Sequence, residues 1–334
     1  MRITPALLLK IARDTVAQRT RSDRGLLSIY LHGSLLEDDP LLGGTADIDL
    51  VFIHDEEHSV EREIQRLTDE VHLDIAHHAR SDYRWARSLR LHPWMGPTII
   101  NCKILYDPQH FMDFTQASVR GQFNQPDNVL GRARGQADHA RQMWFSLHDL
   151  TSKPGLPEIN LYLQAIEHAV NAIASLSGPP LTERRFLQRF PARAEAIGRP
   201  GLYPGLLGLL GGPNVDGQTL SAWLPAWQSA YQAIPAAQAP ARLHPVRCAY
   251  YKRAFEKILS GYHPHDALWP MLRSWAQVML FLPESGVQHQ EWAEAFQRLG
   301  LQGEGFAQRV AALDAYLDTV EELLDGWAHA AGVE

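Results

Sequence analysis

The spacing of apolar residues changes near residue 125, and this change limits the fold more than any other feature of the chain. Before it, short strand-like runs alternate with helical ones. We expect helices at 4–19, 56–70 and 82–90, and strands at 26–32, 48–54, 71–77 and 103–106. After it, apolar residues recur at spacings of three and four almost throughout. The pattern predicts an α+β fold, with a mixed-sheet domain over 1–125 and an all-helical domain over 126–334.

A stretch rich in glycine and proline interrupts the helical pattern at residues 198–218. These two residue types favour turns over helix interiors. Two interpretations are open: a turn-rich connection that splits the helical domain into two subdomains, or a lid.

Charge and cysteine content exclude several classes of protein. The formal net charge of −7 weighs against a protein that grips the phosphate backbone of nucleic acid. Two cysteines make neither a disulfide framework nor a thiolate metal site. No stretch reaches the roughly 18 apolar residues of a membrane span. We therefore expect a cytoplasmic protein whose partners are neither membranes nor nucleic acids.

Two aspartates stand inside an expected strand that is otherwise apolar. Asp47 and Asp49 are two residues apart, so their side chains should leave the strand on the same side. Adjacent carboxylates repel each other unless a cation or a proton lies between them. Oxygen ligands suit Mg²⁺, which usually takes one or two protein carboxylates together with phosphate oxygens. Asp74, in the strand at 71–77, should point to the same side because its apolar neighbours take the opposite face.

The strand at 26–32 ends in a turn made by Gly33 and Ser34. Such a turn offers backbone N–H groups and a hydroxyl with little side-chain bulk. Groups of this kind can hold phosphate oxygens without a lysine-bearing loop.

The order of these features resembles the DNA polymerase β-like nucleotidyltransferase superfamily. Its hallmark is an apolar residue, Gly, Gly or Ser, then a spacer and an Asp-apolar-Asp-apolar motif. The matching residues are His32-Gly33-Ser34 and Asp47-Ile48-Asp49-Leu50, separated by the twelve residues 35–46. His32 departs from the pattern, since that place is usually apolar. An isolated Asp-x-Asp is usually turn chemistry, but five constraints in this order are specific.

The resemblance covers about residues 26–108, where the segment 104–108 is similar to the last core strand of small bacterial members. A catalytic domain followed by helices is most similar in layout to aminoglycoside nucleotidyltransferases of the kanamycin and streptomycin types.

The resemblance implies a metal-dependent transfer of a nucleoside monophosphate. Gly33 and Ser34 would bind the β- and γ-phosphates of a nucleoside triphosphate. Asp47 and Asp49 would hold one or two Mg²⁺ ions, or Mn²⁺ in their place, against the α-phosphate. An acceptor hydroxyl would attack in line and release pyrophosphate. We expect AMP to be transferred from ATP to a small-molecule acceptor.

The general base for the acceptor hydroxyl has two candidates. By the resemblance, Asp74 is the third metal carboxylate or acts as the base itself. Glu167 lies on the expected helix at 157–176, in the region where the aminoglycoside enzymes supply a base. The alternative for Glu167 is an ordinary solvated helix position.

Two other classes of function compete with the small-molecule enzyme. One is a nucleotidyltransferase acting on a protein hydroxyl or an RNA end, as in antitoxins of the minimal type. The acidic net charge weakens the RNA case. The other is an inactive homologue that binds nucleotide, against which the intact Gly33, Ser34, Asp47 and Asp49 count.

His77 and His78 directly follow the third expected strand. Either could touch a nucleotide base or a metal ion, but neighbouring side chains on a strand point to opposite faces. We therefore interpret them as surface residues.

Overall fold

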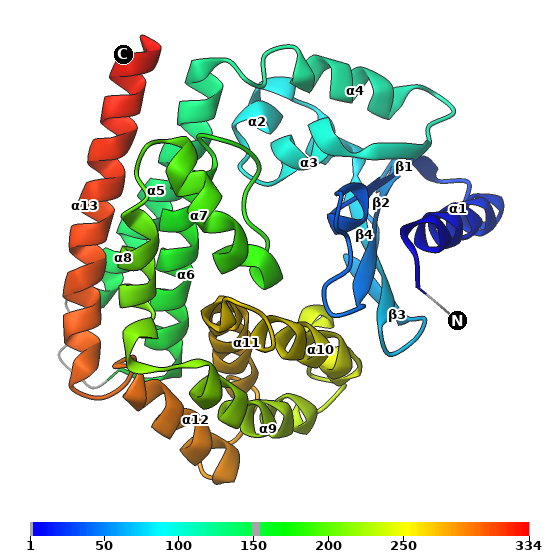
Figure 1. Ribbon diagram of the computed structural model, residues 1–334. Coiled ribbons are helices and arrows are strands. Elements are labelled where there is room, and N and C mark those ends of the chain that lie inside the picture. The colour runs from blue at the N-terminus through cyan, green and yellow to red at the C-terminus, as the bar shows by residue number, and fades with distance from the viewer. Residues whose placement is uncertain (1–2, 149–153, 334) are drawn as a thin grey trace. The chain divides into compact units, whose positions relative to one another are not determined.

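The computed structural model describes residues 3–148 and 154–333 of this protein (Figure 1). The chain divides into two compact units. The first comprises residues 1–124 with 249–254, and the second comprises 125–248 with 255–334. The sheet lies in the first unit and the second is built of helices, so the predicted α+β fold is confirmed.

A five-stranded mixed sheet forms the centre of the first unit, in the order β3-β4-β2-β1-β5. The strands are β1 (Leu26–His32), β2 (Ala46–His54), β3 (Arg62–Arg66), β4 (Val71–Ala79) and β5 (Lys103–Tyr106). Only β2 and β4 are parallel, and the other neighbours are antiparallel. In this register Asp49 of β2 lies beside Asp74 of β4 on one side and His32 of β1 on the other.

Helices cover both faces of this sheet (Figure 1). On one face lies α1 (Pro5–Ser22), which begins where the hydroxyl of Thr4 accepts a hydrogen bond from the Leu7 N–H. Its buried residues recur every fourth position and pack with one set of alternate residues of β2. On the other face lie α2 (Ala86–Leu91), α3 (Met95–Asn101) and α4 (Phe111–Arg120).

The second face has an apolar and an acidic part. Val51 and Ile53 of β2 belong to the core that includes residues of α2, α3 and α4. Each such aliphatic side chain contributes roughly 1.5–3 kcal/mol to stability on burial. Asp47 and Asp49 precede them on the same alternation. The face therefore becomes polar towards the first residues of β2.

Residues 62–66 form a strand, so the predicted helix at 56–70 was wrong. This strand, β3, lies at the sheet edge and pairs antiparallel with β4. The hydroxyl of Thr68 accepts hydrogen bonds from the N–H groups of Glu70 and Val71, at 3.2 Å each, in the turn between the strands. An exposed edge strand carries charged residues for the same reason as a solvated helix, because both meet water. The charged composition of this segment therefore did not distinguish an edge strand from a solvated helix.

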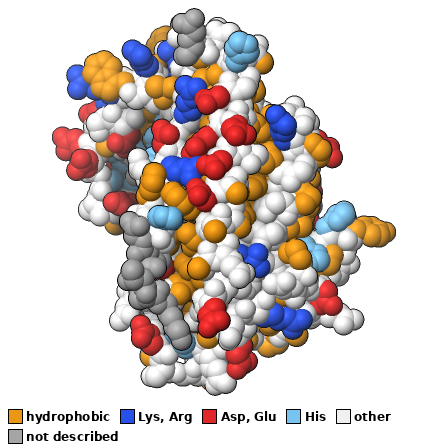
Figure 2. All heavy atoms as spheres, turned by 90° about the vertical axis from the view of Figure 1, so that its left-hand side faces the viewer, with side chains coloured by type: hydrophobic (Ala, Val, Ile, Leu, Met, Phe, Trp, Pro, Cys, Tyr) orange, Lys and Arg blue, Asp and Glu red, His pale blue; other side chains and the backbone are white. Residues whose placement is uncertain are grey.

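The second unit contains α5 to α9, half of α10, and α11 to α13. Their bounds are α5 (Pro126–His148), α6 (Leu156–Ala174), α7 (Phe186–Ala196), α8 (Leu202–Leu209), α9 (Gly217–Ala233), α10 (Cys248–Leu259), α11 (Leu268–Met279), α12 (Val287–Arg298) and α13 (Gly305–Ala331). Arg141 of α5 joins three acids of α13, Asp314, Asp318 and Glu321, at 2.5, 2.6 and 2.8 Å. Figure 2 shows acidic side chains gathered around basic ones on the face that carries α13.

The stretch at 198–218 is mostly helical instead of a turn-rich connection. It contains α8, the short 3-10 helix Gly212–Asn214 and the start of α9. Leu202, Leu206 and Leu209 of α8 are buried. Gly211 has a φ of +72°, and a β-carbon there would lie 2.2 Å from the carbonyl oxygen of Leu299. Glycine therefore permits close packing at this position.

Within residues 3–148 and 154–333, no helix combines the length and the apolar character needed to cross a membrane.

Candidate metal and phosphate site

Three carboxylates of the first unit come together on one face of the sheet. Asp47, Asp49 and Asp74 each offer one oxygen atom, and these atoms all lie within 4.8 Å of one another. Alternation along β2 places the first two on one side, and the parallel register brings Asp74 beside Asp49. The side chains of Asp47 and Asp74 are buried, whereas Asp49 is half-buried. Two of the three carboxylates are thus shielded from solvent, and Asp49 is partly accessible to a ligand.

Gly33 lies against this cluster at the end of β1. Its φ is +79°, and a β-carbon built on it would lie 2.1 Å from Oδ2 of Asp49. Both the backbone conformation and the close approach require glycine here. Ser34 then begins a short 3-10 turn, Ser34–Leu36, in which the Leu36 N–H donates to the Gly33 carbonyl at 3.2 Å. The structure therefore places the Gly33-Ser34 turn directly beside Asp49.

Arg62 of β3 holds Asp74, and sequence reasoning missed it. Its Nε and Nη2 donate to the two carboxylate oxygens of Asp74, each at 2.7 Å. This bidentate geometry fixes the carboxylate plane and offsets one of the three negative charges. A carboxylate oxygen has two lone pairs, so binding Arg62 does not by itself prevent it from binding a metal ion. The sequence did not indicate this pairing, because the segment around Arg62 was expected to be a helix and not a strand beside β4.

His72 and the segment 249–254 lie behind Asp47. The wholly buried imidazole of His72 has its Nδ1 atom 3.8 Å from Oδ1 of Asp47. The ring meets that of Tyr250 edge-on, with centroids 5.7 Å apart. The Tyr250 carbonyl accepts a 3.5 Å hydrogen bond from the Thr45 hydroxyl, and Arg253 pairs with Glu70 at 2.6 Å. No local signal links this segment to β2, since some 200 residues separate them.

His32 explains the one departure from the motif. Burial lowers the pKa of His32 to about 4; the negative charge of Asp74 opposes this shift, and the positive charge of Arg62 adds to it. The imidazole is therefore neutral at physiological pH. A neutral, half-buried ring stands there without adding charge beside Asp49.

Glu167 lies in the second unit, on α6. Its Oε2 atom accepts a hydrogen bond from Nε of Arg273 on α11, at 3.3 Å, and forms an ion pair with Nη2 of the same residue, at 3.2 Å. The side chain of Arg273 is only 6% exposed and that of Glu167 is 21% exposed. Glu167 is thus the partner of a buried cation instead of a solvated helix residue, and its role as a base stays a prediction.

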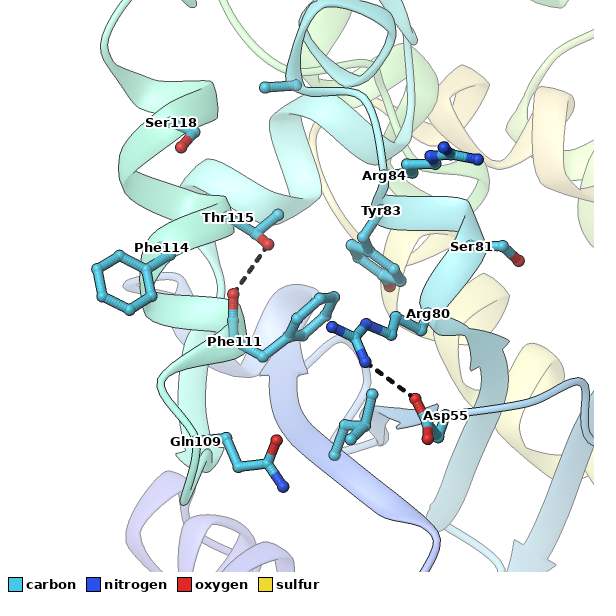
Figure 3. A pocket seen from close by; sticks show the side chains of 12 residues that line it. Asp55, Arg80, Ser81, Tyr83, Arg84, Gln109, Phe111, Phe114, Thr115 and Ser118 are labelled. Atoms are coloured by element: carbon cyan, nitrogen blue, oxygen red, sulfur yellow. Dashed lines mark hydrogen bonds and ion pairs between the residues drawn. The ribbon is translucent and has the colours of Figure 1, made fainter.

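A hollow lined by polar and aromatic residues opens at the other end of the sheet (Figure 3). Arg80 pairs there with Asp55 at 3.2 Å, and its guanidinium lies 5.7 Å from the ring centroid of Phe111. Asp55 directly follows β2, so roughly 20 Å of strand, at about 3.3 Å per residue, separates it from Asp49. That distance is too long for the hollow and the carboxylates to hold one phosphate group.

Comparison with known proteins gives little beyond these residues. No family model and no curated protein matches the chain. Among solved structures, the chain is similar to a nucleotidyltransferase-like protein from Exiguobacterium sibiricum 255-15, with 12% sequence identity and a TM-score of 0.30. The match covers 87% of this chain and 92% of that chain. A likeness this distant does not assign the chain to a family.

Proposed function

We propose that this protein is a metal-dependent nucleotidyltransferase. It transfers a nucleoside monophosphate, AMP from ATP, to a hydroxyl of a small-molecule acceptor and releases pyrophosphate. The observation that carries the proposal is the convergence of Asp47, Asp49 and Asp74 within 4.8 Å beside a glycine that admits no β-carbon.

The donor set fits magnesium. All the ligands on offer are carboxylate oxygens, which are the atoms Mg²⁺ prefers, and phosphate oxygens would complete the coordination. Three carboxylates converge there, and the guanidinium of Arg62 pairs with one of them. One or two divalent ions, with Mn²⁺ as a substitute, would reduce the repulsion between the carboxylates. When bound, the metal stabilises negative charge on the α-phosphate and on the leaving oxygen.

The protein groups then bind and orient the reactants. The N–H groups and hydroxyl of the Gly33-Ser34 turn bind the β- and γ-phosphates, which Gly33 lets approach closely. Asp47 and Asp49 fix the α-phosphate side of the site, and Arg62 keeps Asp74 in place. The proton of the acceptor hydroxyl passes to a carboxylate, for which Asp74 and Glu167 are the candidates.

Net charge favours a small acceptor over a nucleic acid. The formal net charge of −7 would repel an RNA backbone, whereas a polyhydroxylated cation such as an aminoglycoside would be attracted. A protein hydroxyl remains the second acceptor class to be tested.

Transfer of label from α-³²P nucleoside triphosphates tests the proposal. Wild-type protein and Mg²⁺ are incubated with ATP, GTP, CTP or UTP and with panels of hydroxylated metabolites, aminoglycosides, proteins and RNA. We expect labelled product from ATP and a small molecule, and its loss in Asp49→Asn. Asp69→Asn is the matched control, because Asp69 is an exposed aspartate of the same unit that pairs only with its neighbour Arg66 in the described contacts.

Two results would count against the proposal. Binding of Mg²⁺-ATP without label on any acceptor would indicate an inactive homologue. Label transfer that survives in Asp49→Asn would place the chemistry elsewhere.

A further inference from the structure

A second cluster of metal-ligating side chains lies on the other face of the same sheet. His54 ends β2, His77 lies in β4 and His58 lies in the loop after β2. One ring nitrogen from each lies within 4.8 Å of the others. His54 follows Phe52 by two residues along β2, so both side chains point to the face covered by α1. The side chain of Asp49 points to the opposite face. The histidine cluster is therefore separate from the carboxylates.

The ring nitrogens of this cluster divide into inward and outward sets. Inward, His54 Nε2 and His77 Nδ1 are 2.8 Å apart. The ring of His58 stacks on both, with centroids 4.5 Å from that of His54 and 4.1 Å from that of His77. His58 is exposed and belongs to a surface loop, so its ring can turn to present a nitrogen. His54 and His77 are instead held by the sheet.

Each outward nitrogen faces an oxygen atom, and two of them lie within hydrogen-bond distance of it. His77 Nε2 lies 2.9 Å from Oε1 of Glu63. His58 Nδ1 lies 2.8 Å from the Val60 carbonyl oxygen and 3.2 Å from the Val60 nitrogen. His54 Nδ1 lies 3.7 Å from Oδ2 of Asp23. Acceptors of this kind fix the tautomer of metal-ligating histidines and direct the other nitrogen to the ion. Glu63 is itself fixed by Arg19 at 2.8 Å.

The proton shared by His54 Nε2 and His77 Nδ1 occupies the place where a cation would bind. His77 donates its Nε2–H to Glu63, so its Nδ1 accepts the proton of His54 Nε2. A cation could replace that proton if His54 moved its hydrogen to Nδ1, towards Asp23. Two nitrogens bound to tetrahedral Zn²⁺ at about 2.05 Å lie about 3.3 Å apart. The rings would have to separate by about half an ångström from their present 2.8 Å.

We propose that His54, His58 and His77 bind one divalent transition-metal ion of the zinc class. Imidazole ligands suit such ions, whereas Mg²⁺ and Ca²⁺ require oxygen. Three protein ligands, of which His58 is exposed, leave a fourth position to water. The ion would fasten the loop 55–61 to the sheet, and that loop leads directly into Arg62, the residue that holds Asp74.

Metal titration in excess Mg²⁺ tests this inference independently of the nucleotidyltransferase reaction. Mg²⁺ occupies the carboxylates, and Zn²⁺ is then titrated by calorimetry and Co²⁺ by visible absorption. We expect one ion per chain, the ligand-field bands of nitrogen-coordinated Co²⁺, and unchanged binding in Asp49→Asn. A thermal shift with Zn²⁺ gives a second readout by mass action.

Variants locate the ligands. Loss of an orienting residue typically weakens metal affinity 10–100-fold, so we expect roughly that loss in Glu63→Gln and at least as much in His58→Gln. His58 is exposed, so its replacement should leave the fold intact, and His77→Gln provides a second ligand variant. His110→Gln is the control, since His110 is an exposed histidine paired with Asp113.

Two outcomes would overturn the proposal. If the wild-type protein binds neither Zn²⁺ nor Co²⁺ in excess Mg²⁺, the three stacked histidines do not form a metal site. Equal affinity in the wild type, His58→Gln and His77→Gln would place any bound ion elsewhere.

Discussion

Replacing Gly33 by alanine should damage activity more than stability. Its backbone conformation, φ +79° and ψ −162°, is one that residues with a β-carbon adopt only at a cost of roughly 1–3 kcal/mol. The new β-carbon would also stand 2.1 Å from Oδ2 of Asp49, whereas β-carbons essentially never come within 3.0 Å of a heavy atom. The carboxylate would therefore have to move by 0.9 Å, the difference between these distances. A displacement of about 1 Å at reacting groups can reduce turnover by about a hundredfold.

Gly44→Ala separates the two effects. Gly44 has a φ of +75°, but a β-carbon there would meet no heavy atom within 4 Å. Both variants should lose stability in urea unfolding, and only Gly33→Ala should lose label transfer and Mg²⁺-dependent stabilisation by ATP. If Gly33→Ala kept wild-type turnover, or if both variants lost activity equally, the contact with Asp49 would not be the reason for the glycine.

Three further perturbations address single groups of the two units. Asp47→Asn should reduce transfer by orders of magnitude, leave metal-free thermal stability unchanged or raised, and abolish most stabilisation by Mg²⁺-ATP; near-normal turnover would make Asp47 structural. Glu167→Gln should lower the unfolding free energy by about 1–3 kcal/mol, because buried Arg273 loses its charged partner. A lost acidic limb in the pH–rate profile would then identify Glu167 as the base, and an unchanged profile would leave that role to Asp74. The pKa of His32 is about 4 in the folded protein and 6.5 in the unfolded chain, so the unfolded state binds more protons between these two pH values. The free energy of unfolding should therefore fall as pH drops from 6.5 towards 4, by up to roughly 3 kcal/mol. Urea unfolding across that range should show a shallower slope in His32→Leu, and an identical slope would mean that the ring titrates normally.

Local patterns were enough to find most of the sheet. The strands at 26–32 and 103–106 have the bounds that their apolar runs predict. Burial imposes the pattern on the first strand, whereas the apolar residues of the second are half-buried. The edge strand β3 was missed, since its residues meet water and its partner is β4 instead of a sequence neighbour. The helix α3 was missed as well, within the short segment Met95–Asn101 that contains both Gly96 and Pro97.

The candidate site shows the same division between local and distant information. Alternation along two strands suffices to place Asp47, Asp49 and Asp74 on one face. The residues that support them, Arg62 and Tyr250, come from an edge strand and from a segment far along the chain. Pairings of that kind depend on tertiary structure and leave no periodic trace. His77 was wrongly interpreted as a surface residue, since its side chain is 4% exposed.

The assignment of residues 249–254 to the first unit bears on how the protein is made. On the ribosome, the sheet emerges well before Tyr250, which later lies against His72, and before Arg253, which later pairs with Glu70. At synthesis rates of about 5–20 residues per second, the interval between residues 125 and 254 lasts roughly ten seconds. During that time the nascent sheet lacks these two contacts and exposes the surface that they cover. A fragment truncated after residue 125 would remain in that state permanently, so it should aggregate or recruit chaperones more readily than the full chain.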